Sequence, residues 1–451
     1  MELKRKIEEK FKEWKKTSYA LFVYGARQVG KTHIIDRFLK QEYGDYFYLN
    51  FHENINSIKT LIKAENIHDF YLRLSLLDSK KDIETCEAIF LDEIQEYYSF
   101  LEKHPEIDTY FDIISETKYM SLDGRHRIIL SGSLLRLEMN NLITNPVGYL
   151  YPIEMHPLDF EEFILANGVN KDIISIVKNC YESLKEVPEY IHNKLMYLFR
   201  KYILIGGMPK AVSSFLETNS FSSVNMSHIT IDHFIREDIV KYAADNEKLK
   251  IQEIYDLIPS ELSRLSRKFI ISDIPGHKKD HSEQLSFSWL DKAGVTTSIY
   301  IVSEPKFPLK ISSSRNQFKL FHLDVGILTY MLFDYDSKEK ILNNDISINM
   351  GPLYENAVAQ QLKCHGFNEL YYYNNKKLGE VDFLVQKGTD IIPIEVKSGK
   401  NYKYHCALNN IMNISEYDFK NALVLYNGNV KVSGKIIYIP IYMSTFIKKK
   451  L

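Results

Sequence analysis

A glycine-rich loop near the N-terminus constrains the fold of this chain more than any other feature. The apolar run at 19–23 predicts a buried parallel strand, and the apolar residues of 34–39 recur at the spacing of a helix. Between them, residues 25–32 read G-A-R-Q-V-G-K-T and match the pattern G-x-x-x-x-G-K-[ST] at every fixed position. A strand, this loop and a helix in succession predict an α/β fold of the P-loop NTPase kind, with a parallel sheet.

The residue types of this loop suit a triphosphate. Its glycines permit a tight turn whose backbone N–H groups face inward, at a helix N-terminus that favours negative charge. Lys31 would reach the β- and γ-phosphates, and the hydroxyl of Thr32 would bind Mg²⁺. The alternative, a glycine-rich turn that contains Lys-Thr by chance, would not need the flanking strand and helix. We therefore expect nucleotide contacts from Gly25, Ala26, Arg27, Gln28, Val29, Gly30, Lys31 and Thr32.

Length and composition exclude several classes of protein. At 451 residues the chain is long enough for about three domains. Its formal net charge of −2 indicates neither a global basic field for nucleic acid nor an acidic, disordered chain. The four cysteines are far apart and include no C-x-x-C pair, which argues against a disulfide framework and against a zinc site. No apolar run approaches the length of a membrane helix, so we expect a soluble cytoplasmic protein with no membrane partner.

A second apolar run, at 88–91, ends in an acidic pair, Asp92 and Glu93. Open α/β sheets bind ligands at the carboxyl ends of their strands, which is where this pair would lie. Asp92 suits the aspartate that holds Mg²⁺, and Glu93 could orient and deprotonate the attacking water. A strand can also end in acids by chance. The second carboxylate nevertheless favours hydrolysis, because a bare kinase or GTPase would not need it.

A third apolar run, at 127–130, is followed by Ser-Gly-Ser. Ser131 or Ser133 could hydrogen-bond the γ-phosphate or the attacking water, although such a segment is also a common turn. An arginine near this strand, from this chain or from a neighbouring subunit, could stabilise charge in the transition state. Each arginine, taken alone, is expected to be solvated or distant from phosphate. The arginines that flank the strand are Arg125, Arg127 and Arg136.

The three motifs together resemble the AAA+-type ATPases of bacteria and archaea that carry a C-terminal domain of unknown function. Residues 151–163, with P-L-D-F-E-E-F, and residues 202–212, with G-G-M-P-K, are similar to the next two signatures of that family. The resemblance implies ATP as the nucleotide, Mg²⁺ as its metal and a small helical lid, and it allows a homo-oligomer. Relatives usually carry Gly-Arg just before the P-L-x-F-x-E-F run, whereas this chain has Gly148-Tyr149.

Helical patterns followed by a strand and a turn over 246–345 suggest a winged helix. The strand is expected at 297–302 and the turn at 305–308. Basic and acidic residues nearly balance in this segment, so DNA binding and a packing role between domains both stay open. Within the expected lid, a Gly206-Gly207 break followed by Pro209 should end one helix and begin another.

The C-terminal part of the chain carries a second set of candidate residues. Glu355 falls on the core face of a predicted helix, where a carboxylate is costly unless it is paired or bound to metal. A two-residue turn at 388–389 would join two strands and set Asp382 opposite Glu395. Lys397 projects from the same face as Glu395, because strand side chains alternate. Facing carboxylates repel, so Mg²⁺ between Asp382 and Glu395 and a neighbouring lysine are natural stabilisers.

Glu355, Asp382 and the Glu395-x-Lys397 pair resemble the PD-(D/E)XK nuclease superfamily. The resemblance implies a restriction-endonuclease-like α/β domain with Mg²⁺ on Asp382 and Glu395. These four residues would then hydrolyse a phosphodiester, with Lys397 orienting water or countering charge. The alternative is a solvated hairpin with an ordinary ion pair. Residues 351–451 hold 13 lysines, no arginine and 8 acids, a net charge of +5 that is compatible with DNA or RNA.

The sequence thus predicts four domains and two alternative functions. The first function is ATP hydrolysis by Lys31, Glu93 and Ser131, coupled to a nuclease-like domain that cuts or binds nucleic acid. In the second, the ATPase is a regulatory switch and the C-terminal domain only binds a partner. The predicted domains are an AAA+-type ATPase core at 1–165, a helical lid at 166–245, a winged helix at 246–345 and a PD-(D/E)XK nuclease-like domain at 346–451.

Overall fold

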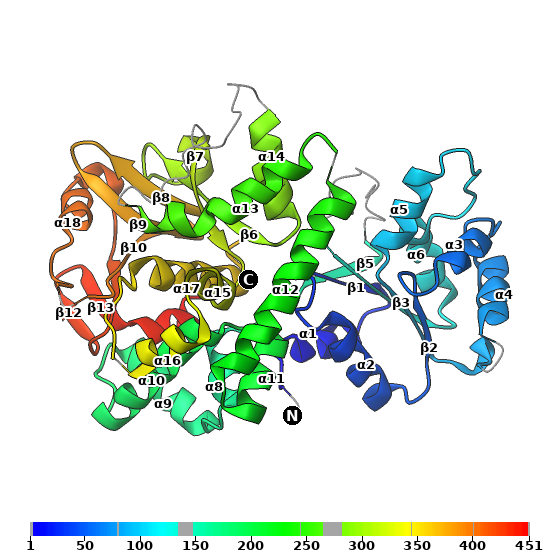
Figure 1. The fold of residues 1–451 in the computed structure, drawn as a ribbon, viewed down its shortest axis with the longest axis horizontal. Coiled ribbons are helices and arrows are strands. Elements are labelled where there is room, and N and C mark those ends of the chain that lie inside the picture. Colours follow the sequence, from blue (N-terminus) through cyan, green and yellow to red (C-terminus); the bar gives the residue numbers. More distant parts are fainter. Residues whose placement is uncertain are drawn as a thin grey trace. The chain divides into compact units, whose positions relative to one another are not determined.

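The computed structural model describes residues 3–78, 81–133, 148–243, 245–264, 282–343, 345–399 and 401–449. The chain divides into two compact units, whose elements are labelled in Figure 1. The N-terminal unit comprises Arg5–His156 and Lys292–Gly294, and the C-terminal unit comprises Met1–Lys4, Pro157–Asp291 and Val295–Leu451. Within the described ranges, no helix has both the length and the apolar character that crossing a membrane requires.

The N-terminal unit is built on a five-stranded sheet whose strands all pair in parallel. The order is β2-β3-β4-β1-β5, so β4 separates the strand before the glycine-rich loop from the strand that carries the acidic pair. Every residue of β3 is buried, which accounts for its continuous apolar run. The parallel sheet predicted for a P-loop NTPase fold is therefore confirmed. Its strands are β1 (Ala20–Tyr24), β2 (Phe47–Asn50), β3 (Ala88–Asp92), β4 (Arg127–Gly132) and β5 (Leu150–Glu154).

The helices of this unit place apolar side chains in its core. In the first helix, Ile7, Phe11 and Trp14 share one face and are buried, and the ring of Phe11 lies 5.2 Å from that of Phe38 on the helix after the glycine-rich loop. These helices are α1 (Ile7–Trp14), α2 (Lys31–Glu42), α3 (Ile55–Leu61), α4 (Ile67–Leu77), α5 (Gln95–Lys103) and α6 (Ile113–Asp123), with a 3₁₀ turn, η1, at Ile83–Thr85.

The C-terminal unit is built on a mixed eight-stranded sheet in the order β12-β13-β11-β10-β9-β8-β6-β7. Its strands are β6 (Thr296–Val302), β7 (Ser313–His322), β8 (Leu370–Asn375), β9 (Gly379–Lys387), β10 (Asp390–Val396), β11 (Ala422–Tyr426), β12 (Lys431–Ser433) and β13 (Ile436–Pro440). Its helices are α8 (Phe160–Ala166), α9 (Lys171–Ser183), α10 (Glu189–Ile205), α11 (Pro209–Thr218), α12 (Phe221–Tyr242), α13 (Lys248–Ser263), α14 (Ser282–Lys292), α15 (Val325–Leu332), α16 (Tyr335–Asn343), α17 (Gly351–Cys364) and α18 (Cys406–Met412), and its 3₁₀ turns are η3 (Leu309–Ser312), η4 (Ser415–Tyr417) and η5 (Ile441–Phe446).

The strand hairpin expected for a winged helix belongs to this large sheet. β6 pairs antiparallel with β7, as a hairpin would, but it also pairs in parallel with β8 from the C-terminal part of the chain. The boundary expected at 345/346 therefore runs through one continuous sheet, and the described residues of 246–345 do not show a separate winged-helix unit. The physical reason is that β6 is buried along most of its length and needs a neighbour on each edge. Pairing between strands so far apart in sequence leaves no local signal.

The helices expected as a lid, at 166–245, lie in the C-terminal unit and not in the N-terminal unit. The predicted break is confirmed: α10 ends at Ile205, and Pro209 begins α11. Between them the N–H of Gly207 donates a hydrogen bond of 2.6 Å to Asp324, just before α15. A helical pattern shows that one face is apolar, but it does not show which domain that face packs against. Here α10 packs against α15 and α17.

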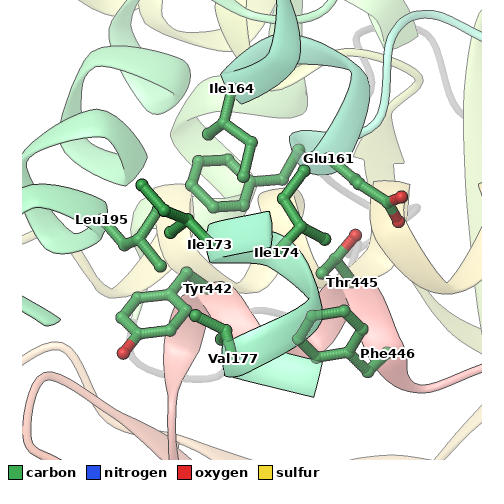
Figure 2. A pocket seen from close by; sticks show the side chains of 10 residues that line it. Glu161, Ile164, Ile173, Ile174, Val177, Leu195, Tyr442, Thr445 and Phe446 are labelled. Carbon is green, nitrogen blue, oxygen red and sulfur yellow. The ribbon is translucent and has the colours of Figure 1, made fainter. Parts of the chain in front are cut away.

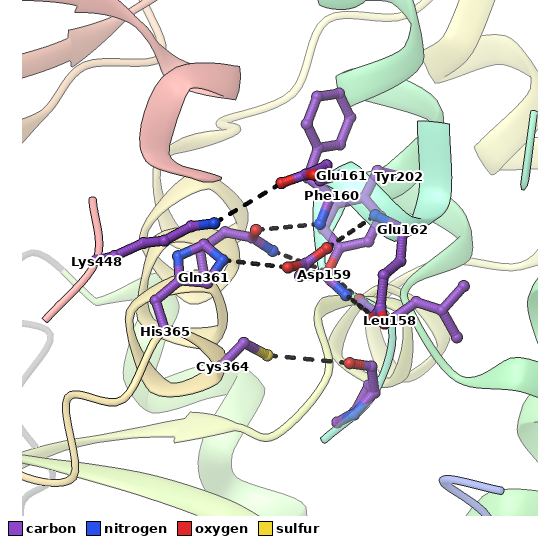
Figure 3. A network of polar contacts seen from close by, with 11 residues as sticks. Leu158, Asp159, Phe160, Glu161, Glu162, Tyr202, Gln361, Cys364, His365 and Lys448 are labelled. Atoms are coloured by element: carbon purple, nitrogen blue, oxygen red, sulfur yellow. Dashed lines mark hydrogen bonds and ion pairs between the residues drawn. The ribbon is translucent and has the colours of Figure 1, made fainter. Parts of the chain in front are cut away.

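The P-L-D-F-E-E-F signature anchors α8 to α17 within the same unit (Figure 3). Asp159 caps α8 by accepting from the N–H of Glu162, at 2.8 Å, and the Glu162 carboxylate accepts from the N–H of Asp159, at 3.1 Å. Across the interface, Oε1 of Gln361 accepts from the N–H of Phe160, at 3.0 Å, and Nε2 of His365 lies 3.2 Å from Oδ2 of Asp159. The signature therefore has a structural role at the start of the C-terminal unit.

An apolar pocket lies next to this anchor, between α8, α9, α10 and η5 (Figure 2). Ile173, Ile174 and Val177 of α9 face Tyr442 and Phe446 of η5 across it. Its wall offers few hydrogen-bonding groups, so we interpret it as a gap in helix packing and not as a polar ligand site.

Candidate functional site

The glycine-rich loop between β1 and α2 has the backbone that its glycines predict. Gly25 has a φ of 150° and Gly30, the N-cap of α2, a φ of 93°, values at which a side chain is strained. A Cβ on Gly25 would also collide with the carbonyl oxygen of Met155. Gln28 takes a positive φ of 64° in the same loop. The loop is therefore tightly wound at the N-terminus of α2, where backbone N–H groups favour an anion.

Lys31 is the charged group of this loop. Its side chain is buried, and Nζ donates hydrogen bonds of 3.0 Å to the carbonyl oxygens of Gly25 and Ala26. The ammonium group thus folds back over the loop. Phosphate oxygens could replace these two carbonyls as acceptors, which would be compatible with the predicted role of Lys31.

Asp92 lies at the end of β3 and is fully buried. Its Oδ2 accepts hydrogen bonds from Thr32 Oγ1, at 2.8 Å, and from the hydroxyl of Tyr48, at 3.1 Å. Its Oδ1 accepts from Ser131 Oγ on β4. Burial raises the pKa of Asp92 and the neighbouring Glu93 carboxylate raises it further, while the hydrogen bonds from Ser131 and Thr32 oppose the rise. The three predicted residues Thr32, Asp92 and Ser131 are therefore together.

The donor set at this point fits Mg²⁺. A hydroxyl and a carboxylate are hard oxygen ligands, and Mg²⁺ is commonly bound by one or two carboxylates together with phosphate oxygens and water. Thr32 and Asp92 would hold it. The described residues include no group of three His, Cys, Asp or Glu side chains that could hold a metal ion, so nucleotide phosphates would have to complete the coordination.

Glu93 follows Asp92 in a strained backbone conformation, with a φ of 55°. Its Oε2 accepts a hydrogen bond from Nε2 of Gln95, and Oε1 of Gln95 accepts one of 3.1 Å from the N–H of Ser133. Gln95 is only 1% exposed and links the carboxylate to the loop after β4. A Cβ on Gly132 would lie 2.8 Å from Oε1 of Gln95, which explains the glycine of Ser-Gly-Ser. Sequence reasoning missed Gln95, although it stands two residues after the acidic pair.

The arginines near this strand have structural partners. The guanidinium of Arg127 lies 4.5 Å from the ring centre of Trp14 and donates a hydrogen bond of 2.6 Å to the carbonyl of Thr17. Arg125 pairs with Asp123 and lies over the ring of Tyr71. Arg125 and Arg127 therefore have partners within the protein, their distance from phosphate stays a prediction, and Arg136 lies outside the described residues.

Arg5, which no sequence motif indicated, forms hydrogen bonds to the glycine-rich loop. It donates hydrogen bonds to the carbonyls of Val29, at 3.1 Å, and His156, at 2.6 Å. The guanidinium therefore ties the loop to the segment after β5.

In the C-terminal unit, the predicted hairpin has the predicted register. Lys387 pairs with Asp390 across a two-residue turn, and Phe383 pairs with Ile394. One step further, Oδ2 of Asp382 accepts a hydrogen bond of 2.8 Å from the N–H of Val396. Asp382 and Glu395 are both buried on this hairpin, and Nζ of Lys397 lies 2.7 Å from Oε1 of Glu395.

Glu355 is buried on α17, on the face predicted from its spacing. Its partner is a residue that sequence reasoning missed, Lys319 of β7, whose Nζ lies 3.6 Å from Oε2 of Glu355. The same ammonium group lies 2.6 Å from Oε1 of Glu380 and 3.9 Å from Oδ1 of Asp382. The available signal was a lysine inside the apolar run F-K-L-F. We call the set Lys319, Glu355, Glu380, Asp382, Glu395 and Lys397 the carboxylate cluster.

Electrostatics inside the carboxylate cluster follow from burial. Removal from water raises the pKa of Glu395 to about 8, the Asp382 carboxylate adds to the rise, and Lys397 and Lys319 oppose it. The predicted metal on Asp382 and Glu395 does not fit this arrangement, because each of these carboxylates already has an ammonium group beside it, Lys319 at 3.9 Å from Asp382 and Lys397 at 2.7 Å from Glu395. The structure therefore brings the four predicted side chains together but places a lysine among them.

Models of known protein families match three separate segments of the chain. Residues 17–164 match the model of an AAA domain. Residues 196–338 and 350–443 match two further models, each described as a domain of unknown function (DUF8612 and DUF4143). The first match supports the prediction of a P-loop ATPase of the AAA kind in the N-terminal part. Neither of the other descriptions names a nuclease or a winged helix.

Among the solved structures, three have a low similarity to this chain. The Walker-type ATPase PABY2304 of Pyrococcus abyssi is 16% identical, with a TM-score of 0.41 over 74% of this chain and 96% of that one. The Drosophila ORC bound to DNA is 11% identical, with a TM-score of 0.28 over 69% and 91%. The STAND protein PH0952 of Pyrococcus horikoshii, with a tetratricopeptide repeat sensor, is 12% identical, with a TM-score of 0.25 over 82% and 47%. A search of curated proteins found no match.

Proposed function

We propose that this chain hydrolyses ATP and uses the cycle to control binding by its C-terminal unit. The observation that carries the first part is the hydrogen bond of 2.8 Å between Thr32 and Asp92, with Glu93 directly beside it. A hydroxyl from the start of α2 and a carboxylate from the end of β3 meet at the mouth of the proposed phosphate-binding loop, and a second carboxylate follows in the chain. This arrangement is what cleavage of a terminal phosphate by water requires.

In the proposed reaction the residues have separate tasks. Lys31 leaves the carbonyls of Gly25 and Ala26 and donates to the β- and γ-phosphate oxygens. Bound Mg²⁺ supplies neutralisation of phosphate charge. Glu93 orients a water molecule and accepts one of its protons as the water oxygen forms a bond to the γ-phosphorus. The bond from the γ-phosphorus to the bridging oxygen breaks, and ADP leaves with that electron pair.

The decisive experiment separates binding from turnover. Glu93→Gln should bind ATP with unchanged affinity and lose nearly all phosphate release, whereas Lys31→Ala should lose ATP binding. Glu87→Gln is a matched control, because Glu87 is exposed and directly precedes β3 at the end opposite Glu93. Equal turnover by the Glu93→Gln variant and the wild type would refute the hydrolytic role, and retained ATP affinity in Lys31→Ala would refute the nucleotide site.

For the C-terminal unit we propose that it binds nucleic acid without cutting it. The net charge of +5 over 351–451 supports binding of DNA or RNA, and all of the basic charge there comes from lysine. The lysine within the carboxylate cluster supports the non-catalytic alternative over cleavage. We therefore derive no metal-dependent step for this unit.

Fluorescence anisotropy with labelled DNA and RNA tests this part. The Glu93→Gln variant saturated with ATP and the wild type saturated with ADP should differ in affinity, and both should weaken as salt rises. No binding in either state would favour a protein partner instead. Nicking of either nucleic acid in Mg²⁺ would contradict the non-catalytic role.

A further inference from the structure

We propose that Lys319 is the built-in cation of the carboxylate cluster and takes the place that a divalent metal would need. This inference deepens the proposed binding role of the C-terminal unit, and it does not depend on ATP hydrolysis. It assigns the cluster to a class of site that its sequence pattern does not suggest, one in which the chain supplies its own counter-charge.

The position of Lys319 is the first argument. Its side chain is 0% exposed, and its ammonium group lies within 4 Å of carboxylate oxygens from α17 and from β9. The ring of Tyr372 on β8 lies 5.2 Å from the same nitrogen. A lysine is rarely buried unless it is paired, and here three carboxylates and one aromatic face surround it. Lys319 therefore belongs to the interior of the carboxylate cluster.

Charge balance is the second argument. The cluster contains four carboxylates, of which Glu355, Asp382 and Glu395 are buried and Glu380 is partly exposed, and buried carboxylates are costly unless a cation is near. Lys397 pairs with Glu395 at 2.7 Å, which leaves Lys319 as the cation nearest the other three. The sequence predicted that buried Glu355 needs either a partner or a metal. The structure supplies the partner.

Space is the third argument. Mg²⁺ needs oxygen ligands at about 2.1 Å in near-octahedral arrangement. Each of the two carboxylates predicted to hold the ion already has an ammonium group beside it, Lys319 at 3.9 Å from Asp382 and Lys397 at 2.7 Å from Glu395. Two cations cannot share that volume, because they repel at close range in a buried site. Metal entry would require Lys319 to leave.

The surrounding backbone opposes such a departure. Asn356, next to Glu355 on α17, donates a hydrogen bond of 3.0 Å to the carbonyl of His322 on β7 and accepts one of 2.9 Å from its N–H. This pair clamps the helix that carries Glu355 to the strand that carries Lys319. The lysine cannot withdraw from the carboxylates by separation of these two elements without breaking both hydrogen bonds.

Removal of the lysine should convert the cluster into a metal site. Lys319→Met keeps an unbranched side chain of similar length but leaves Glu355, Glu380 and Asp382 without its positive charge. A divalent cation is then the natural replacement. Lys338→Met is the matched control, because Lys338 on α16 is equally buried but lies outside the cluster.

The test uses Mn²⁺ alone, with the full chain free of nucleotide, and measures bound Mn²⁺ by electron paramagnetic resonance. We expect no saturable Mn²⁺ at the cluster of the wild type or of Lys338→Met. Lys319→Met should bind one more Mn²⁺ per chain, and the double variant with Asp382→Asn should lose it. A Thr32→Val version of each protein removes any contribution from the nucleotide site.

Binding of metal at the cluster while Lys319 is present would overturn the proposal. One Mn²⁺ per chain that is retained in Thr32→Val and lost in Asp382→Asn would show that metal displaces Lys319. If Lys319→Met unfolds, recovery of its thermal transition on addition of Mn²⁺ supports the proposal. Failure of that recovery, together with Mn²⁺ binding by the wild type, overturns it. Loss of nucleic-acid binding would refute only the proposed function, because metal binding is measured separately.

Discussion

The hydroxyl of Thr32 donates a hydrogen bond of 2.8 Å to Oδ2 of Asp92, although the two residues are 60 positions apart in the chain. Thr32 lies at the start of α2, after β1, and Asp92 is the last residue of β3. The strands β1 and β3 are not neighbours in the sheet, because β4 lies between them. The order of the parallel strands therefore assembles the site. Ser131, from the intervening strand, completes it from the other side of the Asp92 carboxylate.

Replacement of Thr32 should affect the metal more than the nucleotide. We expect Thr32→Val to lower the affinity for Mg·ATP by about tenfold and to leave ATP affinity in EDTA nearly unchanged, because only the metal-binding hydroxyl is lost. Thr32→Ser keeps the hydroxyl and should bind both forms normally. Titration calorimetry with and without Mg²⁺ measures the difference, and an equal loss in both conditions would contradict a metal-binding role.

Gln95 should act as a positioning residue for Glu93. In Gln95→Ala we expect kcat to fall about tenfold to a hundredfold with little change in KM, because the carboxylate loses the side chain that orients it. Gln95→Glu keeps the length of the side chain but cannot donate the hydrogen bond, and it should be at least as slow. A steady-state phosphate-release assay measures both constants, and a change confined to KM would argue against positioning.

The anchor in Figure 3 should stabilise the C-terminal unit. Asp159→Ala removes the N-cap of α8 and the partner of His365, and we expect a loss of about 3 kcal/mol in the free energy of unfolding. Asn170→Ala removes only an exposed N-cap, that of α9, and should cost about 1 kcal/mol. Urea denaturation followed by circular dichroism measures both, and equal losses would show that the pair with His365 contributes nothing.

Buried His322 should make the chain sensitive to acid. Burial lowers its pKa to about 3, and the charge of Arg236 lowers it further. Below its ordinary pKa of 6.5 the unfolded histidine takes up a proton that the folded one rejects, so stability falls as the pH drops from 6.5 toward 3. At pH 5 the loss should be about 2 kcal/mol.

His322→Phe tests this pH dependence, because it keeps a ring against Tyr255 but cannot be protonated. Thermal unfolding between pH 7 and pH 4.5 should show a shallower decline in Tm for the variant than for the wild type. Parallel curves would mean that other groups cause the acid sensitivity.

The two predicted sites differ in how much of them was visible in the sequence. The loop at 25–32 and the register of the hairpin around Gly388 depend on residues close together in the chain, so local patterns predict them correctly. Gln95 and Lys319 have no such pattern. Lys319 meets Glu355 through the packing of α17 on β7, and Gln95, although only two residues from Glu93, is held by Ser133 of the loop after β4.

The sequence by itself determined the glycine-rich loop, the acidic pair at the end of β3, and the register of the hairpin that carries Asp382 and Glu395, because backbone geometry and strand alternation act over a few residues. Only the tertiary structure decided that β6 joins β8, that the expected lid lies with the C-terminal unit, and that a lysine lies within the carboxylate cluster. These outcomes depend on which apolar faces and buried charges find each other across long stretches of chain, and local physics does not specify that choice.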